Sequence, residues 1–430
     1  MRPAARAQAA IELLDQIARD TAPADRLVAG YFRARRYAGA KDRAAINDIV
    51  YGVLRHRGDY AWHGGGADSR GLVLAHLMRR PDADAEAIEA LFDGGRFAPA
   101  PLETAEREIL DRLAGPAKAP APAWARGNYP AWLHEGLESQ FGDGLATEMA
   151  ALNGRAPVDL RVNTLKSEPA EAAAELAADG IATRPGRWSP ACLSLAERTD
   201  ISRHRLYRDG HVEVQDQGSQ IAALLTGGAA GEQVVDYCAG GGGKSLALAA
   251  MMGNRGQIFA FDQDPRRLRQ LHQRAQRAGA RNLQIPALSE AGAEGPLAAL
   301  RGRADMVLAD VPCSGSGAWR RNPEARWRLT PEALTGYCDT QRDILARAAE
   351  LVRPGGRLIY VTCSLLPAEN GDQITGFLAT GDGFEAVPVT DAWPSTMAGD
   401  CPADGTSLQL TPARHDTDGF FIAVMRRRAL

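Results

Sequence analysis

From residue 233 onward, short apolar runs alternate with helical segments, and this rhythm constrains the fold more than any other feature of the sequence. Seven runs have the length and composition of strands, and helical patterns follow most of them. The strands are expected at residues 233–237, 257–262, 282–286, 305–310, 356–362, 384–388 and 419–426. Alternation of this kind predicts an α/β fold with a parallel, doubly wound sheet. Residues 391–407 are expected to form an irregular loop between the last strands.

Three of these strands open into loops that carry reactive side chains. The loops comprise residues 236–245 (DYCAGGGGKS), residues 310–317 (DVPCSGSG) and residues 362–364 (TCS). In an open parallel sheet, ligands bind beyond the carboxyl ends of the strands. The three loops should therefore converge on one crevice, which would hold a glycine loop and two thiols.

The glycine loop 240–243 lies between an apolar strand and a helix, so it suits a ligand that approaches the backbone closely. A nucleoside-triphosphate loop is excluded, because that motif needs a glycine five residues before Gly243, where this chain has Cys238. A purely structural tight turn stays an alternative. Asp262, which is 19 residues after Gly243, suits a ribose hydroxyl pair, whereas Asp264 before a proline suits a helix N-cap.

Cys313 and Cys363 are the candidate reactive groups, because each lies in a loop beyond the carboxyl end of a strand. A thiolate can attack carbon 6 of a pyrimidine, which makes carbon 5 nucleophilic enough to accept a methyl group. A second thiol could then assist release of the product. The alternative that both thiols are structural stays open at this point. Three other cysteines are interpreted as small buried hydrophobes: Cys192, Cys338 and Cys401.

The residues before the α/β region predict two further domains. Apolar side chains recur at helical spacing through residues 4–60, and the pattern continues at 71–79 and 102–114. An Ala/Pro-rich run at 114–123 has the composition of a semi-rigid linker. Further on, β-like pieces at 158–163 and 211–215 flank a helix at 168–178. We therefore expect an all-α domain at 1–120, a small α+β module at 121–225 and the doubly wound domain at 226–430.

Composition indicates which partners and which cellular compartment to expect for the chain. The net charge of the whole chain is only −3, but residues 1–80 carry 14 Lys and Arg against 8 Asp and Glu. This positive bias is compatible with nucleic-acid contact, and also with ordinary variation of surface charge. Six cysteines without Cys-x-x-Cys or Cys/His zinc spacing indicate a reducing cytoplasm and no metal site. No apolar run approaches the ~18 residues of a membrane span, and acidic residues interrupt the N-terminal segment. We expect a cytoplasmic protein without membrane contact, and a monomer because no long apolar seam stands out.

Several segments resemble the RsmB/Nop/Sun family of RNA cytosine-5 methyltransferases, and in particular its bacterial RsmB-like branch. The two cysteine loops are the most specific of these, and the matches extend over about residues 128–425. The matching segments are 310–317 (DVPCSGSG), 362–370 (TCSLLPAEN), 320–324 (RRNPE), 161–166 (RVNTLK), 214–220 (VQDQGSQ) and 418–421 (DGFF). Residues 42–55 (DRAAINDIVYGVLR) resemble the NusB-like RNA-binding module of that branch.

The resemblance implies a class I methyltransferase (Rossmann-like) sheet that uses S-adenosylmethionine on RNA, with small-subunit ribosomal RNA as the expected partner. Cys363 would be the nucleophile, Cys313 would help to resolve the covalent adduct, and Asp310 would touch the target base or the methionine end of the cofactor. Asp262 would hold the ribose. The methionine portion would lie on a loop made of Cys238, Ala239, Gly240, Gly241, Gly242, Gly243 and Lys244.

A cluster of arginines after the first cysteine loop is expected to bind backbone phosphate, with a solvated charged loop as the alternative. These are Arg320 and Arg321, with Arg326 and Arg328 close behind them. The target nucleotide would be flipped out or already unpaired, because carbons 5 and 6 are poorly accessible in a base stack.

The chain departs from the family pattern at two places. Gly240 and Gly241 replace an Ala-Pro pair in the glycine loop, which removes a rigid proline. The acid expected after the third strand is missing, and Glu290 is the possible substitute. These departures leave a second reading open, a catalytically idle RNA-binding assembly factor, although such a factor would need neither thiol.

Overall fold

The computed structural model of the 430-residue chain describes residues 1–115, 120–286, 297–381 and 383–429. It separates into two compact units. The first comprises Met1–Arg155 and Ala318–Thr330, and the second comprises Ala156–Gly317 and Pro331–Leu430. No helix of the described residues is long and apolar enough to cross a bilayer.

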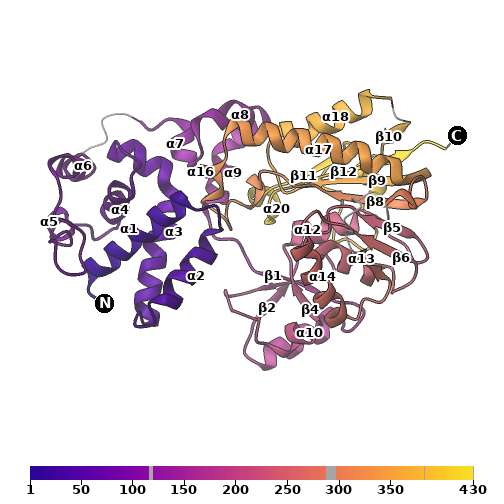
Figure 1. Ribbon diagram of the computed structural model, residues 1–430, viewed down its shortest axis with the longest axis horizontal. Coiled ribbons are helices and arrows are strands. Elements are labelled where there is room, and N and C mark those ends of the chain that lie inside the picture. The colour runs from indigo at the N-terminus through magenta and orange to yellow at the C-terminus, as the bar shows by residue number, and fades with distance from the viewer. Residues whose placement is uncertain (116–119, 287–296, 382, 430) are drawn as a thin grey trace. The chain divides into compact units, whose positions relative to one another are not determined.

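The first unit is built from helices (Figure 1). They are α1 (Pro3–Arg19), α2 (Ala24–Ala34), α3 (Ala40–Gly64), α4 (Ser69–Met78), α5 (Ala85–Glu89), α6 (Thr104–Ala114), α7 (Ala123–Gly127), α8 (His134–Phe141), α9 (Leu145–Asn153) and α16 (Ala325–Arg328). Apolar side chains at helical spacing, such as Leu13, Ile46 and Val50, are fully buried and form the core. The all-α character of this region is confirmed, and its likeness to a NusB-like module stays a prediction.

The boundaries of the first unit differ from the expected division at residue 120. Helices α7 to α9 belong to it, and so does α16, which follows the first cysteine loop in the chain. Arg326 on α16 explains this, because its guanidinium donates to the carbonyl oxygens of Asn128 (2.8 Å) and Leu152 (3.2 Å) and to Oδ1 of Asn153 (2.5 Å). The three-domain division stays a prediction of the sequence.

The second unit contains a small antiparallel sheet of order β2-β3-β1-β4 and a larger sheet. The small sheet confirms the predicted α+β arrangement, since helix α10 (Pro169–Ala178) packs on it through Leu176. Its strands are β1 (Asp159–Val162), β2 (Thr183–Pro185), β3 (Cys192–Leu195) and β4 (Val212–Val214), and the short helix α11 (Arg205–Arg208) precedes β4. The sequence did not predict β2 and β3.

Within the described residues, the larger sheet has eight strands in the order β10-β12-β9-β8-β5-β6-β7, with β11 paired to β12. They are β5 (Gln233–Asp236), β6 (Gln257–Ala260), β7 (Leu283–Gln284), β8 (Ala304–Asp310), β9 (Val352–Thr362), β10 (Phe384–Ala386), β11 (Ser407–Leu410) and β12 (Phe420–Arg427). Strands β5 to β9 are parallel, as predicted. The last three strands are antiparallel to their neighbours, and β11 begins at Ser407, the last residue of the segment expected to be an irregular loop.

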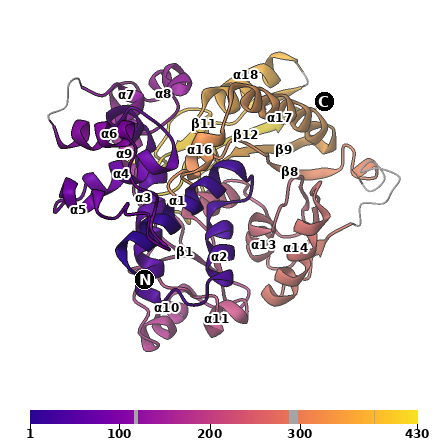
Figure 2. The ribbon, with the colours of Figure 1, turned by 60° about the vertical axis from the view of Figure 1, so that its left-hand side comes forward.

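Helices cover both faces of the larger sheet (Figures 1 and 2), so the doubly wound arrangement is confirmed. Val234 on β5 faces one side and packs with helices α12 (Gln217–Leu224) and α13 (Gly243–Met251). Its neighbour Val235 faces the other side, with α17 (Pro331–Leu351) and α18 (Gly371–Ala379). Among the described residues, this unit also contains the helices α14 (Pro265–Ala278), α19 (Val389–Ala392) and α20 (Pro412–His415).

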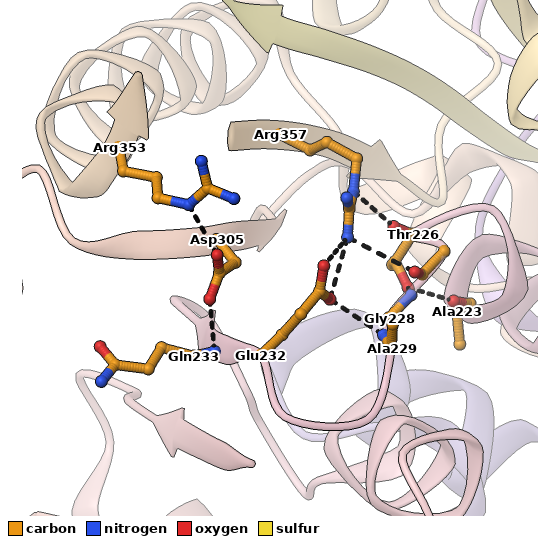
Figure 3. A network of polar contacts seen from close by, with 10 residues as sticks. Ala223, Thr226, Gly228, Ala229, Glu232, Gln233, Asp305, Arg353 and Arg357 are labelled. Carbon is orange, nitrogen blue, oxygen red and sulfur yellow. Dashed lines mark hydrogen bonds and ion pairs between the residues drawn. The ribbon is translucent and has the colours of Figure 1, made fainter. Parts of the chain in front are cut away.

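A polar network holds the amino ends of the central strands together (Figure 3). Asp305 on β8 accepts hydrogen bonds from the Gln233 N–H of β5 (2.7 Å) and from Nε of Arg353 (2.6 Å). Arg357 of β9 contacts both carboxylate oxygens of Glu232, at 2.8 and 3.0 Å. Burial opposes ionisation of Asp305, but these donors and the nearby arginines keep its pKa below the usual value. The opposite edge of the sheet, where the strands end, is left for the loops that carry the thiols.

Candidate active site

The two predicted reactive cysteines lie in contact. Asp310 ends β8 and is paired with Val361 of β9 in parallel register, so both strands deliver their loops to the same edge of the sheet. The Sγ atoms of Cys313 and Cys363 are 3.3 Å apart, within hydrogen-bond distance for sulfur. Both residues are half-buried. The predicted convergence of the two thiols is therefore confirmed.

The two thiols have different surroundings. The hydrogen bond with Cys363 and burial raise the pKa of Cys313 well above its usual value. Cys313 therefore keeps its proton at neutral pH and can donate it in a hydrogen bond to the sulfur of Cys363. The assignment of Cys363 as the nucleophile of the pair stays a prediction from the family resemblance.

Glu369 connects the two cysteine loops. Its side chain is fully buried in the 3-10 turn Pro367–Glu369, and one carboxylate oxygen accepts from the Ser314 N–H (2.8 Å) and from Nε2 of Gln341 (3.0 Å). The other carboxylate oxygen accepts from the hydroxyl groups of Ser314 and Ser364. Ser314 follows Cys313 and Ser364 follows Cys363, so one carboxylate holds the neighbours of both thiols.

The Cys363 loop has further support that does not depend on Glu369. Thr362 donates through its hydroxyl to Oδ1 of Asn370 (2.6 Å), and Asn370 donates through Nδ2 to the Ser364 carbonyl (3.0 Å). The Gly317 N–H donates to the Cys363 carbonyl at 2.9 Å. The roles of Glu369 and Asn370 were not predicted, although the Glu-Asn pair stands in the segment that resembles the family.

The glycine loop adopts a conformation that needs glycine at two positions. Gly240 and Gly242 have φ values of +54° and +84°, which non-glycine residues rarely adopt. A Cβ atom on Gly242 would also lie 2.0 Å from Cδ1 of Leu271 on α14. An added Cβ on Gly240 would meet no clash, since its nearest neighbour, Oδ2 of Asp262, would be in ordinary van der Waals contact at 3.9 Å. The glycine that replaces the family's alanine at position 240 therefore suits the left-handed backbone conformation that the loop adopts there.

Lys244 and Asp310 join the glycine loop to the cysteine loops. Nζ of Lys244, at the start of α13, lies 2.7 Å from Oδ2 of Asp310. Lys244 is buried, so this ion pair is held in a restricted position at the carboxyl edge of the sheet. The residue predicted to touch the base or the cofactor is thus adjacent to the predicted cofactor loop.

Asp262 follows β6 and faces the same loop. Its Oδ2 accepts from the Gly240 N–H (2.8 Å), and its Oδ1 accepts from the Asp264 N–H (2.8 Å). Asp264 accepts from the Arg266 N–H (2.9 Å) and caps α14, as predicted. The binding of a ribose by Asp262 stays a prediction. Glu290, the possible substitute for the missing acid, lies outside the described residues.

Burial opposes the charged form of two groups at the glycine loop, the buried Asp236 and the half-buried Cys238. Burial raises the pKa of Asp236 to about 7, and its Oδ2 accepts from the Ser245 hydroxyl at 2.6 Å. Burial, followed by the nearby carboxylates Asp236 and Asp310, raises the pKa of Cys238 well above its usual value. Cys238 is therefore a neutral thiol that supports the loop.

The arginines expected to bind phosphate lie in the helical unit. Arg326 is fully buried, and its guanidinium donates to the carbonyl oxygen of Asn128, which caps α7, and to oxygens of α9. The prediction of a phosphate contact is therefore wrong for this residue. Arg328 donates to the carbonyl oxygen of Ile17 at 2.8 Å. Arg320 is only 4% exposed and Arg321 is half-buried, and their role in RNA binding stays a prediction.

Two family models match the chain. A model described as 16S rRNA methyltransferase RsmB/F matches residues 223–426, and a model described as an RsmF/B-like ferredoxin-like domain matches residues 129–202. The first match contains both cysteine loops and the glycine loop. The second contains part of the small antiparallel sheet.

Similar proteins from distant organisms carry related names. A probable ribosomal RNA small subunit methyltransferase B of Synechocystis is 34% identical over 304 residues, which is 70% of this chain and 67% of that protein. A mouse 28S rRNA (cytosine-C(5))-methyltransferase is 33% identical over 293 residues, 63% of this chain and 62% of that protein. The protein in the solved structure titled Crystal Structure of PH0851 is 26% identical in sequence. The two structures align over 99% of each chain with a TM-score of 0.77.

Proposed function

Since the chain belongs to the 16S rRNA methyltransferase RsmB/F family, we propose that it transfers a methyl group from S-adenosylmethionine to carbon 5 of a cytosine in small-subunit ribosomal RNA. The names of the relatives support the substrate class, and the mouse relative supports the position on the base. The observation that carries the proposal is the contact of two thiols at the carboxyl ends of β8 and β9.

Cys363 would add through its sulfur to carbon 6 of the cytosine, which makes carbon 5 nucleophilic. The protonated Cys313 would donate a hydrogen bond to the Cys363 sulfur in the free enzyme. After methyl transfer, a base must take the proton from carbon 5. The electron pair of that carbon–hydrogen bond re-forms the 5,6 double bond, and the electron pair of the carbon–sulfur bond leaves with the Cys363 sulfur. We expect Cys313, whose sulfur lies 3.3 Å from that of Cys363, to assist this release.

The residues at the glycine loop fit S-adenosylmethionine, which supplies an electrophilic methyl group when it is bound. Asp262 faces the loop with a carboxylate that can accept from ribose hydroxyl groups. Asp310 and Lys244 offer charges of both signs at 2.7 Å, which suits the ammonium and carboxylate of an amino acid end. Gly240 leaves room for close approach, since nothing lies within 3.9 Å of an added Cβ.

Incubation with labelled S-adenosylmethionine and total RNA from a strain that lacks the gene tests the proposal. We expect label in 5-methylcytidine after nucleoside analysis, none with Cys363→Ala, and a covalent protein–RNA species that accumulates with Cys313→Ala. A wild-type protein that binds RNA but transfers no label would contradict the proposed activity and favour an idle assembly factor. Normal turnover of Cys313→Ala would contradict the division of roles between the thiols.

A further inference from the structure

Tyr37 is the most exposed bulky apolar side chain of the described residues, with 71% of its surface exposed. It lies in the turn between α2 and α3 of the helical unit. The turn itself is fixed, because the next residue, Ala38, is buried and its N–H donates to the Arg35 carbonyl at 3.0 Å. A ring held in solvent by an ordered turn is available for stacking.

The same turn carries a concentration of positive charge. Residues 33–43 contain five Lys and Arg side chains against one acid, Asp42. Asp42 is occupied by Arg6, whose Nε lies 2.9 Å from its Oδ1. Arg35 pairs with Glu12 at 3.3 Å, and Arg43 donates through Nε to the Ala38 carbonyl at 2.8 Å.

Three cations of this segment are left to face outward. Arg33, Arg36 and Lys41 are exposed, and within the part of the chain that the structure describes no carboxylate lies within ion-pair distance of them. A hollow beside the turn is lined by the cations Arg33, Arg36 and Arg43 together with the apolar Ala29 and Phe32. We call Arg33, Arg36, Tyr37 and Lys41 the α2–α3 surface.

We propose that the α2–α3 surface is a docking surface for single-stranded RNA, in which Tyr37 stacks on a base and the three cations contact phosphates. This rests on the proposed function, in that RNA is the substrate. Guanidinium groups match phosphate geometry, and aromatic rings stack on any unpaired base. An acidic peptide would use the charges but would have no need for the ring. A membrane surface would need more exposed apolar side chains than the single ring of Tyr37.

Binding of a labelled single-stranded RNA 20-mer to the full chain, measured at several salt concentrations, tests the surface. The Arg33→Ala/Arg36→Ala variant should bind about tenfold more weakly at low salt. The slope of log Kd against log salt should fall by about 1.4, or about 0.7 for each phosphate that an arginine no longer neutralises. The matched control is Arg80→Ala/Arg107→Ala. It removes the same charge from residues paired with Asp48 and Glu89, and should change neither quantity.

The ring is tested separately. Tyr37→Ala should raise Kd by at least about fivefold with an unchanged salt slope, and Tyr37→Phe should restore binding, because stacking needs only the ring. Equal binding by Tyr37→Ala, an unchanged slope in the arginine variant, or equally tight and Tyr37-dependent binding of polyglutamate would each overturn the proposal.

Methylation by the same variants separates this proposal from the proposed activity. The arginine variant should raise the KM for RNA and leave kcat unchanged. An unchanged KM would overturn the docking surface while the proposed activity stood. Absence of transfer by the wild-type chain would count against the proposed activity and leave the binding results to decide on the surface.

Discussion

Replacement of Glu369 by alanine should separate formation of the covalent adduct from its release. The side chain is the shared acceptor for Ser314, Ser364 and Gln341. The Cys363 loop keeps its bonds to Asn370 and to Gly317 when Glu369 is removed, whereas Ser314 loses the acceptor of its N–H. The alanine variant should therefore displace Cys313 more than Cys363.

The size of the effect follows from the groups left without partners. The two serine hydroxyls can turn to each other, because their oxygens are already 3.4 Å apart. The Ser314 N–H and one of the two N–H groups of Gln341 Nε2 cannot, so a half-buried donor and a buried donor each lose a partner at about 1–3 kcal/mol. We expect the variant to lose about 2–6 kcal/mol of unfolding free energy. Release of the adduct should slow by about tenfold or more.

The assay is a single-turnover methylation reaction followed on denaturing gels, with the affinity for S-adenosylmethionine measured by calorimetry. Glu369→Ala should accumulate a covalent protein–RNA species and bind the cofactor as the wild type does. Glu369→Gln is the matched control: its carbonyl can accept from both N–H donors and the hydroxyls can turn to accept from its amide, so turnover should stay close to normal.

The same geometry governs the pairing of the free thiols. Mild oxidation with diamide should join Cys313 and Cys363 rapidly in the wild type, where the sulfurs are 3.3 Å apart, and more slowly in Glu369→Ala. Normal release of product together with unchanged thiol pairing in Glu369→Ala would refute the positioning role. A parallel loss of cofactor binding and adduct formation would instead indicate a general loss of the fold.

Three further predictions test the supporting structure. Gly242→Ala should weaken cofactor binding, measured by calorimetry, because its Cβ would meet Leu271; Gly253→Ala has a similar positive φ in open space and is the control. Burial raises the pKa of Asp236 to about 7, above its value in the unfolded chain, so the native state holds the extra proton and stability should fall as pH rises from about 4 to about 7. Asp236→Asn should flatten that part of the unfolding profile, and an unchanged profile would contradict the raised pKa. Arg326→Met should lower the unfolding free energy by about 2–4 kcal/mol in thermal melts, because it leaves buried carbonyl oxygens unpaired; a loss below about 0.5 kcal/mol would contradict this.

The order of apolar strands predicted most of the large sheet, because strands buried on both faces are continuous apolar runs. The loops after β5, β8 and β9 could be placed at one edge by the general rule for parallel sheets. The contact between Cys313 and Cys363 could not, since it depends on the parallel register of β8 and β9 and on the carboxylate of Glu369. A Glu-Asn pair a few residues after a cysteine shows nothing of this by itself.

The features that the sequence pattern did not predict lie in short or polar segments. Strands β2 and β11 have few apolar residues and depend on pairing with β3 and β12, so their local pattern is weak. The arginines after the first cysteine loop suggested an exposed phosphate site. Arg326 is instead buried against the carbonyl oxygens of Asn128 and Leu152, partners more than 170 residues away that no local pattern indicates.

The central claim, attack on cytosine by the Cys363 thiol, is tested most directly by mapping a trapped adduct. RNA that contains 5-fluorocytidine should be attacked and methylated but not released, because carbon 5 then carries no proton to lose. Digestion and mass spectrometry of the trapped protein should place the nucleotide on Cys363. An adduct on Cys313, or methylation of normal RNA with no adduct on either residue, would contradict the account.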